Sequence, residues 1–446
     1  YKSINERKFV LREVIRLKEV PVTLNGETLV VDGKTAFLPN SKVHVYFLHL
    51  PDYFDRKDLY VDSATGKDFE DNAERFAFFS KAVLETLKLL YWQPDIIHCN
   101  DWQTALIPYY LKTHYKDDEF FQNTRTVLTI HNLAYQGSFP LEKAAKVGIS
   151  EEYIQPGREF EFYGKLNFLK GGILFADILN TVSKRYAEEI LSDPEMGAGF
   201  TDILKSREKN VFGILNGVDY TSWNPEDDEL IYETYTSESL DKKSSNKKVL
   251  CKQNNLKYSE DVPMIGIISR LVDQKGFDLI AEAIEKLMKM NLQLVILGTG
   301  DPQYHELFQN LCEKYPEKLA VNLRFDNKLA HLIEAGSDMF LMPSRYEPCG
   351  LNQLYSLKYG TIPIVRETGG LADTIIDYTE NPKEGNGFTF KEYTADAMMK
   401  AVQRAVDVYK DSKKWTAIQK KGMQEDYSWD RAAREYLSLY EKTMTE

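Results

Sequence analysis

The sequence has few cysteines and no long apolar run. Its 446 residues include only 4 cysteines, scattered without C-x-x-C spacing, so neither a disulfide framework nor a structural zinc site is indicated. No stretch of about 18 consecutive apolar residues is present, so a membrane-spanning helix is not expected. The residues after Tyr1 also lack the charged and then apolar layout of a signal peptide. We expect a protein of the reducing cytoplasm with no membrane partner.

Positive charge is in deficit. The chain has 56 Lys and Arg against 68 Asp and Glu, a formal net charge of -12. An excess of negative charge repels polyanions, and no dense Lys/Arg stripe interrupts it, so no nucleic-acid partner is expected. The 7 histidines form no H-x-x-x-H spacing, and no strand leads into a D-x-D pattern. We therefore expect neither a bound metal nor another cofactor.

Short apolar runs alternate with helical patterns from about residue 95 onward. The runs are DIIHC, TVLTI, ILNTV, VFGIL, MIGIIS, LQLVILG, MFLMP and IPIV. Continuous apolar strands separated by helices are typical of parallel sheets covered on both faces. The predicted fold class is α/β.

Two local patterns refine this prediction. After QKG, apolar residues recur at three- and four-residue spacing and predict a helix with one buried stripe; they are Phe277, Ile280, Ala281, Ile284, Leu287 and Met288. Residues 20–50 contain Asn25-Gly26 and Asp32-Gly33, dipeptides that favour tight turns between antiparallel strands. An antiparallel lobe is therefore expected near the amino terminus.

The length suggests two or three domains. Residues 224–248 are polar, and the strand and helix alternation restarts at Pro263. We place a first domain at 1–224 and a second at 225–415. Ligands of open α/β sheets bind at the carboxyl ends of the strands, so we expect the site in a cleft between the two domains.

Two cations flank the junction SRLVDQKG. Arg270 directly follows the strand MIGIIS, and Lys275 lies where the following helix is expected to begin. A planar Arg and a compact Lys suit a diphosphate and can stabilise charge on a departing nucleoside diphosphate. The alternative is that both are surface cations that keep the loop in contact with water and bind no ligand.

The segment SRYEPCGLNQLYSLKYG follows the strand MFLMP and enters an expected helix. Helix amino termini offer unpaired N–H groups to anions, so the backbone of Gly350, Leu351 and Asn352 would face the diphosphate. Glu347, just before the turn, would be free to bind sugar hydroxyls. Helix capping or solvation of Glu347 is the alternative.

The first half offers a histidine and an aspartate at strand ends. His131 follows TVLTI and Asp101 follows DIIHCN, so both can point into the cleft. A purely structural role is the alternative for His131. His98 lies within a strand and is expected to pack against its neighbours.

Six segments in this order resemble bacterial glycogen synthase and plant starch synthase. They are HCNDWQTAL, TIHNLAYQG, ILNGVD, SRLVDQKG, EPCGLNQLYSLKYG and TGGLADT, and the resemblance covers nearly the whole chain. It implies the GT-B fold, two facing Rossmann-like domains, with residues 416–446 forming a helix that crosses back to the first domain. A plastid location would follow for a plant protein.

The resemblance also implies roles for individual residues. Arg270 and Lys275 resemble the diphosphate-binding cations, Glu347 the acid beside the transferred glucose, and His131 the histidine near the anomeric centre. The remaining donor-side residues are Gly350, Leu351, Asn352, Tyr355, Cys349 and Asn216, and those of the cleft or acceptor side are Asp101, Asn132 and Tyr135. Cys349 matches an active-site cysteine, although a small buried residue in a turn is equally compatible.

The implied activity is retaining transfer of glucose from ADP-glucose or UDP-glucose to the 4-hydroxyl of an α-1,4-glucan. One family feature, a K-x-G-G-L loop in the first domain, does not occur ahead of Tyr1. A chain without this loop is expected to bind nucleotide but to transfer glucose slowly. The alternatives are another retaining GT-B glycosyltransferase and a glucan-binding pseudoenzyme.

Overall fold

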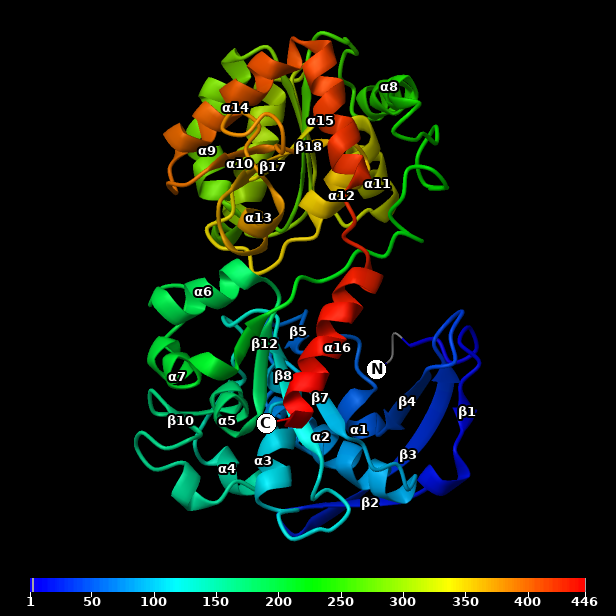
Figure 1. Ribbon diagram of the computed structural model, residues 1–446, viewed down its shortest axis with the longest axis vertical. Helices are drawn as coiled ribbons and strands as arrows, with labels where there is room; N and C mark the ends of the chain where they lie inside the picture. Colours follow the sequence, from blue (N-terminus) through cyan, green and yellow to red (C-terminus); the bar gives the residue numbers. More distant parts are fainter. Residues whose placement is uncertain (2–3, 446) are drawn as a thin grey trace. The chain divides into compact units, whose positions relative to one another are not determined.

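The computed structural model describes Tyr1 and residues 4–445 (Figure 1). The chain divides into two units. The first unit comprises Tyr1–Asn180, Ile190–Phe212 and the residues from Ser438 onward, and the second comprises Thr181–Glu189 and Gly213–Leu437. The domain boundaries placed at 224 and 415 stay predictions.

The second unit contains a six-stranded parallel sheet in the order β16-β15-β14-β17-β18-β19. Its strands are β14 (Met264–Ile268), β15 (Gln293–Leu297), β16 (Leu319–Asn322), β17 (Met339–Met342), β18 (Ile362–Arg366) and β19 (Phe388–Phe390). Numbered along the chain this is the order 3-2-1-4-5-6, which reverses direction between β14 and β17. Ligands of such sheets bind at this switch point, outside the strand carboxyl ends.

Helices cover both faces of this sheet (Figure 1). Helices α9 (Phe277–Lys289), α10 (Pro302–Lys314) and α14 (Ala395–Tyr409) share one core with the strands, and α8 (Lys243–Gln253) and α11 (Asn327–Gly336) share the other. The predicted stripe of α9 is buried except at Ala281, which is only half-buried, while Ala283 is buried in its place. The α/β class and the buried helix are confirmed.

The first unit is built on the sheet order β13-β12-β8-β7, in which β7 and β8 run parallel. These strands are β7 (Ile96–Asn100), β8 (Arg125–Ile130), β12 (Ile178–Thr181) and β13 (Val211–Gly213). The principal helices of this unit are α2 (Asn72–Leu89), α3 (Leu106–Lys112) and α5 (Phe168–Phe175). All eight apolar runs named from the sequence contain strands.

The predicted antiparallel lobe is present, but one of its predicted turns is wrong. Strands β2 (Val20–Leu24) and β3 (Glu27–Phe37) form a hairpin in which Asn25 and Gly26 have φ of 47° and 81°. Strands β1 (Arg12–Glu13) and β4 (His44–His49) also pair with β3. Asp32-Gly33 lies inside β3 and makes no turn.

Packing explains the wrong turn. A Cβ on Gly33 would lie 2.4 Å from the Cβ of Leu17, so the glycine admits this buried side chain against the strand. The Asp32 carboxylate accepts a hydrogen bond from the Glu19 N–H at 2.9 Å. Both residues therefore hold residues 17–19 against β3.

The remaining helices and strands include two long helices, α15 and α16, and a set of shorter elements. The helices are α1 (Pro51–Phe54), α4 (Lys143–Lys146), α6 (Lys184–Ser192), α7 (Thr201–Ser206), α12 (Asn352–Lys358), α13 (Gly369–Thr374), α15 (Ser412–Gln424) and α16 (Trp429–Thr445), and the strands are β5 (Val61–Asp62), β6 (Lys67–Asp68), β9 (Ser138–Phe139), β10 (Glu161–Phe162) and β11 (Lys165–Asn167). Within residues 1 and 4–445, no helix is both long and apolar enough to cross a membrane.

Residues 416–446 do not form the single helix expected, because the chain leaves α15 at Gln424 and starts a second helix, α16, at Trp429. The Ser428 hydroxyl accepts from the Arg431 N–H at 3.4 Å, and Ala432 and Leu439 are buried. Near the end of α16, the Tyr440 hydroxyl lies 2.7 Å from Nδ1 of His98. Burial lowers the pKa of His98 to about 4. His98 is thus the packed, neutral strand histidine expected from the sequence.

Candidate active site

A pocket of about 240 Å³ lies at the switch point of the second unit. Its lining comes from the ends of β14 and β17 and from the loops that follow them, and consists of Ile267, Ile268, Ser269, Lys275, Leu341, Met342, Ser344, Glu347, Gly350, Leu351 and Asn352. Pockets for whole drug-sized ligands measure roughly 300–1,000 Å³. This pocket therefore suits only one part of a ligand of that size.

An ion pair joins two of the predicted residues in this pocket. Lys275 Nζ lies 2.6 Å from Glu347 Oε2. The Ser344 hydroxyl donates to the same carboxylate oxygen at 3.1 Å. Glu347 is 6% exposed, so its charge depends on these two partners. Glu347 is therefore already paired with Lys275, and its contact with sugar hydroxyls stays a prediction.

Backbone contacts fix the loop that carries Lys275. Gly276 follows it with φ 78°, and a Cβ there would lie 2.2 Å from the carbonyl oxygen of Pro343. The Arg345 N–H donates to the Gln274 carbonyl at 2.9 Å. The two loops that bear Lys275 and Glu347 are therefore held together by main-chain contacts.

The turn between Glu347 and α12 is held in a similar way. The Gly370 N–H donates to the carbonyls of Glu347 and Pro348, both at 3.1 Å. The side chain of Asn352, the first residue of α12, donates to the Ile268 carbonyl at 2.6 Å. The Asn352 amide thus links α12 to the end of β14.

Arg270 differs from the other predicted donor residues. Its side chain is exposed, does not line the pocket, and makes a 3.5 Å contact with Gln274. Gly350, Leu351 and Asn352 do line the pocket. The structure therefore brings Lys275, Glu347 and the start of α12 together and leaves Arg270 outside.

Cys349 and Asn216 lie beside the pocket lining. Cys349 is 6% exposed, and burial raises the pKa of its thiol to about 12 while the Asn216 N–H donates to it. The thiol is therefore protonated at neutral pH. The buried side-chain oxygen of Asn216 has no hydrogen-bond partner in the described part of the chain, so it can accept from a ligand.

Tyr355 lies on α12, one turn after Leu351 and Asn352. Its ring is half-buried and stacks on Trp223, with centroids 4.1 Å apart and an interplanar angle of 3°. Tyr355 does not line the 240 Å³ pocket itself. It adds an aromatic surface next to it.

In the first unit, hydrogen bonds join three predicted residues at the ends of β7 and β8. The Asp101 carboxylate accepts from the His131 N–H at 2.8 Å and from the Asn132 N–H. Burial raises the pKa of Asp101, and its φ of 55° is unusual for a non-glycine residue. Strained backbone of this kind clusters at functional sites.

The ring of His131 is also held. Its Nε2 lies 2.9 Å from the side-chain oxygen of Asn100, so this nitrogen carries the donated proton. Tyr135, on the following loop, is 51% exposed and donates its N–H to the Asn132 carbonyl. Tyr135 lies farther out than the other three predicted residues.

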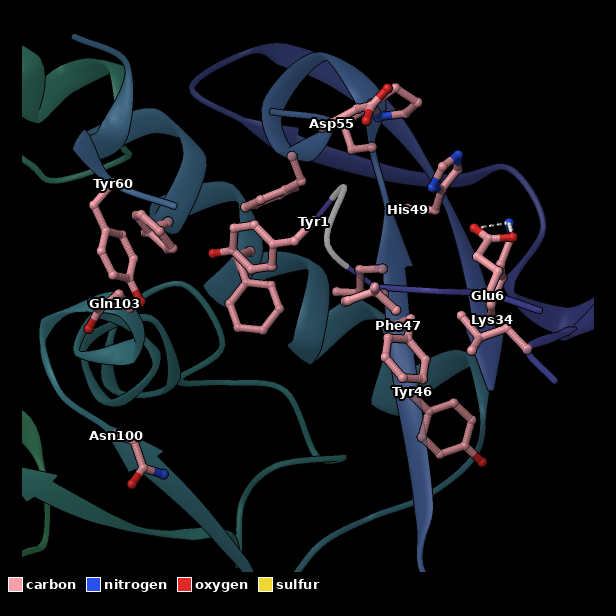
Figure 2. A pocket seen from close by; sticks show the side chains of 18 of the residues that line it. Tyr1, Glu6, Lys34, Tyr46, Phe47, His49, Asp55, Tyr60, Asn100 and Gln103 are labelled. Carbon is pink, nitrogen blue, oxygen red and sulfur yellow. Dashed lines mark hydrogen bonds and ion pairs between the residues drawn. The ribbon is translucent and has the colours of Figure 1, made fainter. Parts of the chain in front are cut away.

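Asn100, Asp101 and His131 also line a pocket of about 700 Å³ within the first unit. Figure 2 shows its aromatic side chains Tyr1, Tyr46 and Tyr60, together with Asn100. The Glu6 and Lys34 side chains form an ion pair of 2.8 Å at one side. The pocket lies beside β4 and the end of β7.

Sequence reasoning missed three contributors. Ser344 comes directly after the strand MFLMP, and Asn100 ends β7, so their positions at strand ends were available signals. Trp223 directly precedes the polar residues 224–248, and only the three-dimensional stack on Tyr355 identifies it. Within residues 1 and 4–445, no group of three or more His, Cys, Asp or Glu side chains could hold a metal ion.

Family models match both halves of the chain. A model described as the starch synthase catalytic domain matches residues 1–206, and one described as glycosyl transferases group 1 matches residues 252–422. The glycogen synthase of Thermosipho africanus is 46% identical over 99% of this chain and 89% of its own length. That of Thermotoga maritima is 46% identical over 96% of this chain and 87% of its own.

Two solved structures are also similar. The catalytic domain of starch synthase IV from Arabidopsis thaliana, bound to ADP and acarbose, has a TM-score of 0.88 and 33% identity, covering 98% of this chain and 89% of that one. Sucrose-phosphate synthase from Thermosynechococcus elongatus has a TM-score of 0.54 and 19% identity, covering 87% of this chain and 82% of that one. At this identity the likeness shows the fold alone. The predicted GT-B class is confirmed, and the chain belongs to the glycogen and starch synthase family of glycosyltransferases.

Proposed function

We propose that this glycosyltransferase moves glucose from ADP-glucose to the non-reducing 4-hydroxyl of an α-1,4-glucan, with retention of configuration. UDP-glucose is the alternative donor. The observation that carries the proposal is the Lys275–Glu347 ion pair in the pocket at the β14/β17 switch point, in a chain whose relatives are glycogen synthases. The similar starch synthase IV binds ADP, which favours ADP-glucose.

The diphosphate of the donor would lie against Lys275. Its ammonium group has three N–H donors, and the contact with Glu347 uses one of them, so two are left for phosphate oxygens. The backbone of Gly350 and Leu351 supplies further donors at the start of α12. Arg270, exposed on the same loop, would swing onto the diphosphate as a second cation.

The glucose would lie against Glu347. Its carboxylate accepts hydrogen bonds and can orient sugar hydroxyls, and its low exposure keeps water from competing. The unpartnered oxygen of Asn216 would accept from the donor as well. Tyr355 would supply a surface on which the nucleobase stacks.

Retention can arise in two ways. A double displacement needs a carboxylate nucleophile about 5 Å from a second carboxylic acid, whereas Glu347 is the only carboxylate in the lining of the second unit's pocket. We therefore assign front-face departure and return. The bond between glucose C1 and the diphosphate oxygen breaks with its electron pair on the diphosphate, the diphosphate oxygen accepts the proton of the acceptor 4-hydroxyl, and that hydroxyl oxygen bonds to C1 on the same face.

The first unit would supply the acceptor side. His131, Asp101 and Asn132 form a hydrogen-bonded group at the ends of β7 and β8, and His131 would contact the sugar near its anomeric carbon. Asp101 holds the backbone of that loop in place. Tyr135, exposed on the loop, would contact the glucan.

Labelled donor tests the proposal. The protein is incubated with ADP-[¹⁴C]glucose or UDP-[¹⁴C]glucose and with either glycogen or monosaccharide acceptors. We expect the label to be incorporated into glycogen and to be released again by enzymes that cleave α-1,4 bonds. The rate of incorporation should be higher with ADP-glucose than with UDP-glucose. Label only in disaccharides would indicate another retaining GT-B transferase, and glycogen binding without incorporation would indicate a pseudoenzyme.

A further inference from the structure

A carboxyl group lies fully buried in the second unit, outside the set of residues that the proposed function uses. Glu334, on α11, is 0% exposed. One of its carboxyl oxygens accepts a hydrogen bond from the hydroxyl of Ser356, on α12, at 2.7 Å. The other oxygen is buried and has no hydrogen-bond partner in the described part of the chain.

This environment decides the charge of Glu334. A buried carboxylate needs several hydrogen-bond donors or a paired cation, because the low-dielectric interior does not otherwise support its charge. Ser356 supplies one hydrogen bond to one oxygen, and the second oxygen receives none. A neutral acid therefore fits this environment better than a carboxylate. Burial accordingly raises the pKa of Glu334 to about 8.

A buried lysine lies beside Glu334 but binds the main chain. The Lys243 ammonium, on α8, donates to the carbonyl oxygens of Glu334 and Ala335 at 3.1 and 2.8 Å. It also donates to the Thr361 hydroxyl at 2.8 Å. The two carbonyls lie in the last turn of α11, where the helix dipole favours a cation. Lys243 therefore caps the helix that carries Glu334.

Ser356 connects the buried acid to the donor pocket. It lies four residues after Asn352, so the two side chains share one face of α12. Asn352 lines the 240 Å³ pocket and bonds to the carbonyl at the end of β14. A displacement of α12 at Ser356 would therefore move the backbone that is proposed to bind the diphosphate.

We propose that Glu334 is a positioning residue that holds α12 in its donor-binding geometry while its carboxyl group is neutral, and that loss of its proton at alkaline pH weakens donor binding. The inference rests on the proposed function and deepens it, since it assigns a pH-dependent control to the same site. A new buried charge attracts water or the Lys243 ammonium. Water would separate α11 from α12, and movement of Lys243 would uncap α11, so α12 shifts in both cases.

The other titratable groups that face Glu334 come from α8, the segment before it, α12 and the residue after α12. They are Lys243, Tyr235, Tyr355 and Tyr359, with His331 one turn earlier on α11 itself. Strands β14 and β15, which also pack against α11, contain no titratable side chain.

Only Lys243 competes with Glu334 for a titration between pH 7 and pH 9 among the lysine and tyrosine groups. Burial raises the pKa of Tyr355 to about 12 and raises those of Tyr235 and Tyr359 well above their usual value. Burial lowers the pKa of Lys243 to about 7. The two groups therefore titrate as a coupled pair, and substitution has to assign the step to one of them.

The experiment measures the dissociation constant of ADP by calorimetry at pH 7, 8 and 9. If only the neutral form of Glu334 is competent to bind, the apparent constant rises as the neutral fraction falls, about 10-fold at one pH unit above the pKa. We therefore expect ADP to bind the wild-type chain about 10-fold more weakly at pH 9 than at pH 7. Glu334→Gln has no proton to lose and should show no such step.

Two further variants complete the experiment. Ser356→Ala removes the hydrogen bond that favours the charged form of Glu334, so its loss of affinity should begin at a higher pH than in the wild-type chain. Glu313→Gln, at an exposed position of α10, removes one negative charge elsewhere in the same unit. This matched control should keep the wild-type pH dependence.

Three results would overturn the inference. They are a wild-type dissociation constant that does not change between pH 7 and pH 9, a step that persists in Glu334→Gln, and a step that begins at the wild-type pH in Ser356→Ala. The second result would assign the step to Lys243 or another group. Should Glu334→Gln fail to fold, the comparison of Ser356→Ala with the wild-type chain decides.

Failure of the proposed function is seen separately. A chain that shows the Glu334-dependent step but puts no label into glycogen refutes the proposed transfer and leaves the positioning role standing. A wild-type chain that binds no ADP at any of the three pH values refutes both.

Discussion

At the scale of single residues, the candidate site depends on a buried carboxylate and its cation. Glu347 and Lys275 are 72 positions apart, and the sequence identified each by its place after a strand. It did not reveal that they bind one another at 2.6 Å, because that contact depends on how two loops pack. The ion pair means that Glu347 acts on a ligand with its charge already partly balanced.

Substitution of Glu347 should separate catalysis from nucleotide binding. In Glu347→Ala, we expect glucosyl transfer to fall about 10²-fold or more, on the scale of losing one group that stabilises the transition state. The dissociation constant of ADP should stay within about threefold, because Lys275 remains and loses a competing partner. Glu347→Gln, which keeps the shape, is the control for packing.

Steady-state transfer rates and ADP calorimetry on the same preparations check this prediction. Transfer at the wild-type rate in Glu347→Ala would remove the residue from the site. A parallel loss of ADP affinity would assign it to the diphosphate.

Cys349 should be chemically inert in the folded protein. Burial raises its pKa to about 12, so the thiol stays protonated at pH 8, and the thiolate is the reactive form. Iodoacetamide at pH 8 should therefore leave Cys349 unmodified, while the half-buried Cys312 reacts faster. Mass spectrometry of the labelled peptides measures this, with all 4 cysteines alkylated in urea as the control. Rapid native labelling of Cys349 would contradict the burial described for it.

At the scale of elements, sequence patterns succeeded where local chemistry decides the structure. The stripe of α9 and the Asn25-Gly26 hairpin follow from periodicity and from positive φ, both of which are local. Asp32-Gly33 carries the same turn signal but lies within β3, since Leu17 packs against the glycine. That contact depends on tertiary packing, which overrides local preference.

A pair of glycines tests how the loop before α9 is held. Gly276 and Gly157 have nearly equal φ, 78° and 79°, but a Cβ would lie 2.2 Å from the Pro343 carbonyl oxygen at Gly276 and would meet nothing within 4 Å at Gly157. Gly157→Ala should cost only backbone strain, about 1–2 kcal/mol. Gly276→Ala should cost about 1–3 kcal/mol more, since the backbone must also move.

Urea unfolding of both variants measures the difference in free energy of unfolding. Gly276→Ala should also reduce ADP affinity, because Lys275 is the preceding residue. Equal losses of stability in the two variants would show that the loop tolerates the extra methyl group.

At the scale of the whole molecule, the alternation of apolar runs and helices predicted the α/β class, and six motifs predicted the GT-B family. The strand order 3-2-1-4-5-6 of the second unit explains why two of those motifs, SRLVDQKG and EPCGLNQLYSLKYG, contain site residues: they follow β14 and β17, the strands at the switch point. The Trp223 stack and the position of Arg270 outside the pocket were not predictable, since no periodic or local signal encodes them.

The central claim is that the second unit holds the donor diphosphate at the switch point through its cations. Calorimetric titration of ADP into the wild-type chain and into the double variant Arg270→Ala, Lys275→Ala tests it most directly. We expect the wild-type chain to bind ADP and the double variant to bind it at least about 100-fold more weakly, because each charge-assisted hydrogen bond contributes roughly 1.5–3 kcal/mol. Equal affinities in the two proteins would contradict the claim and place the diphosphate elsewhere.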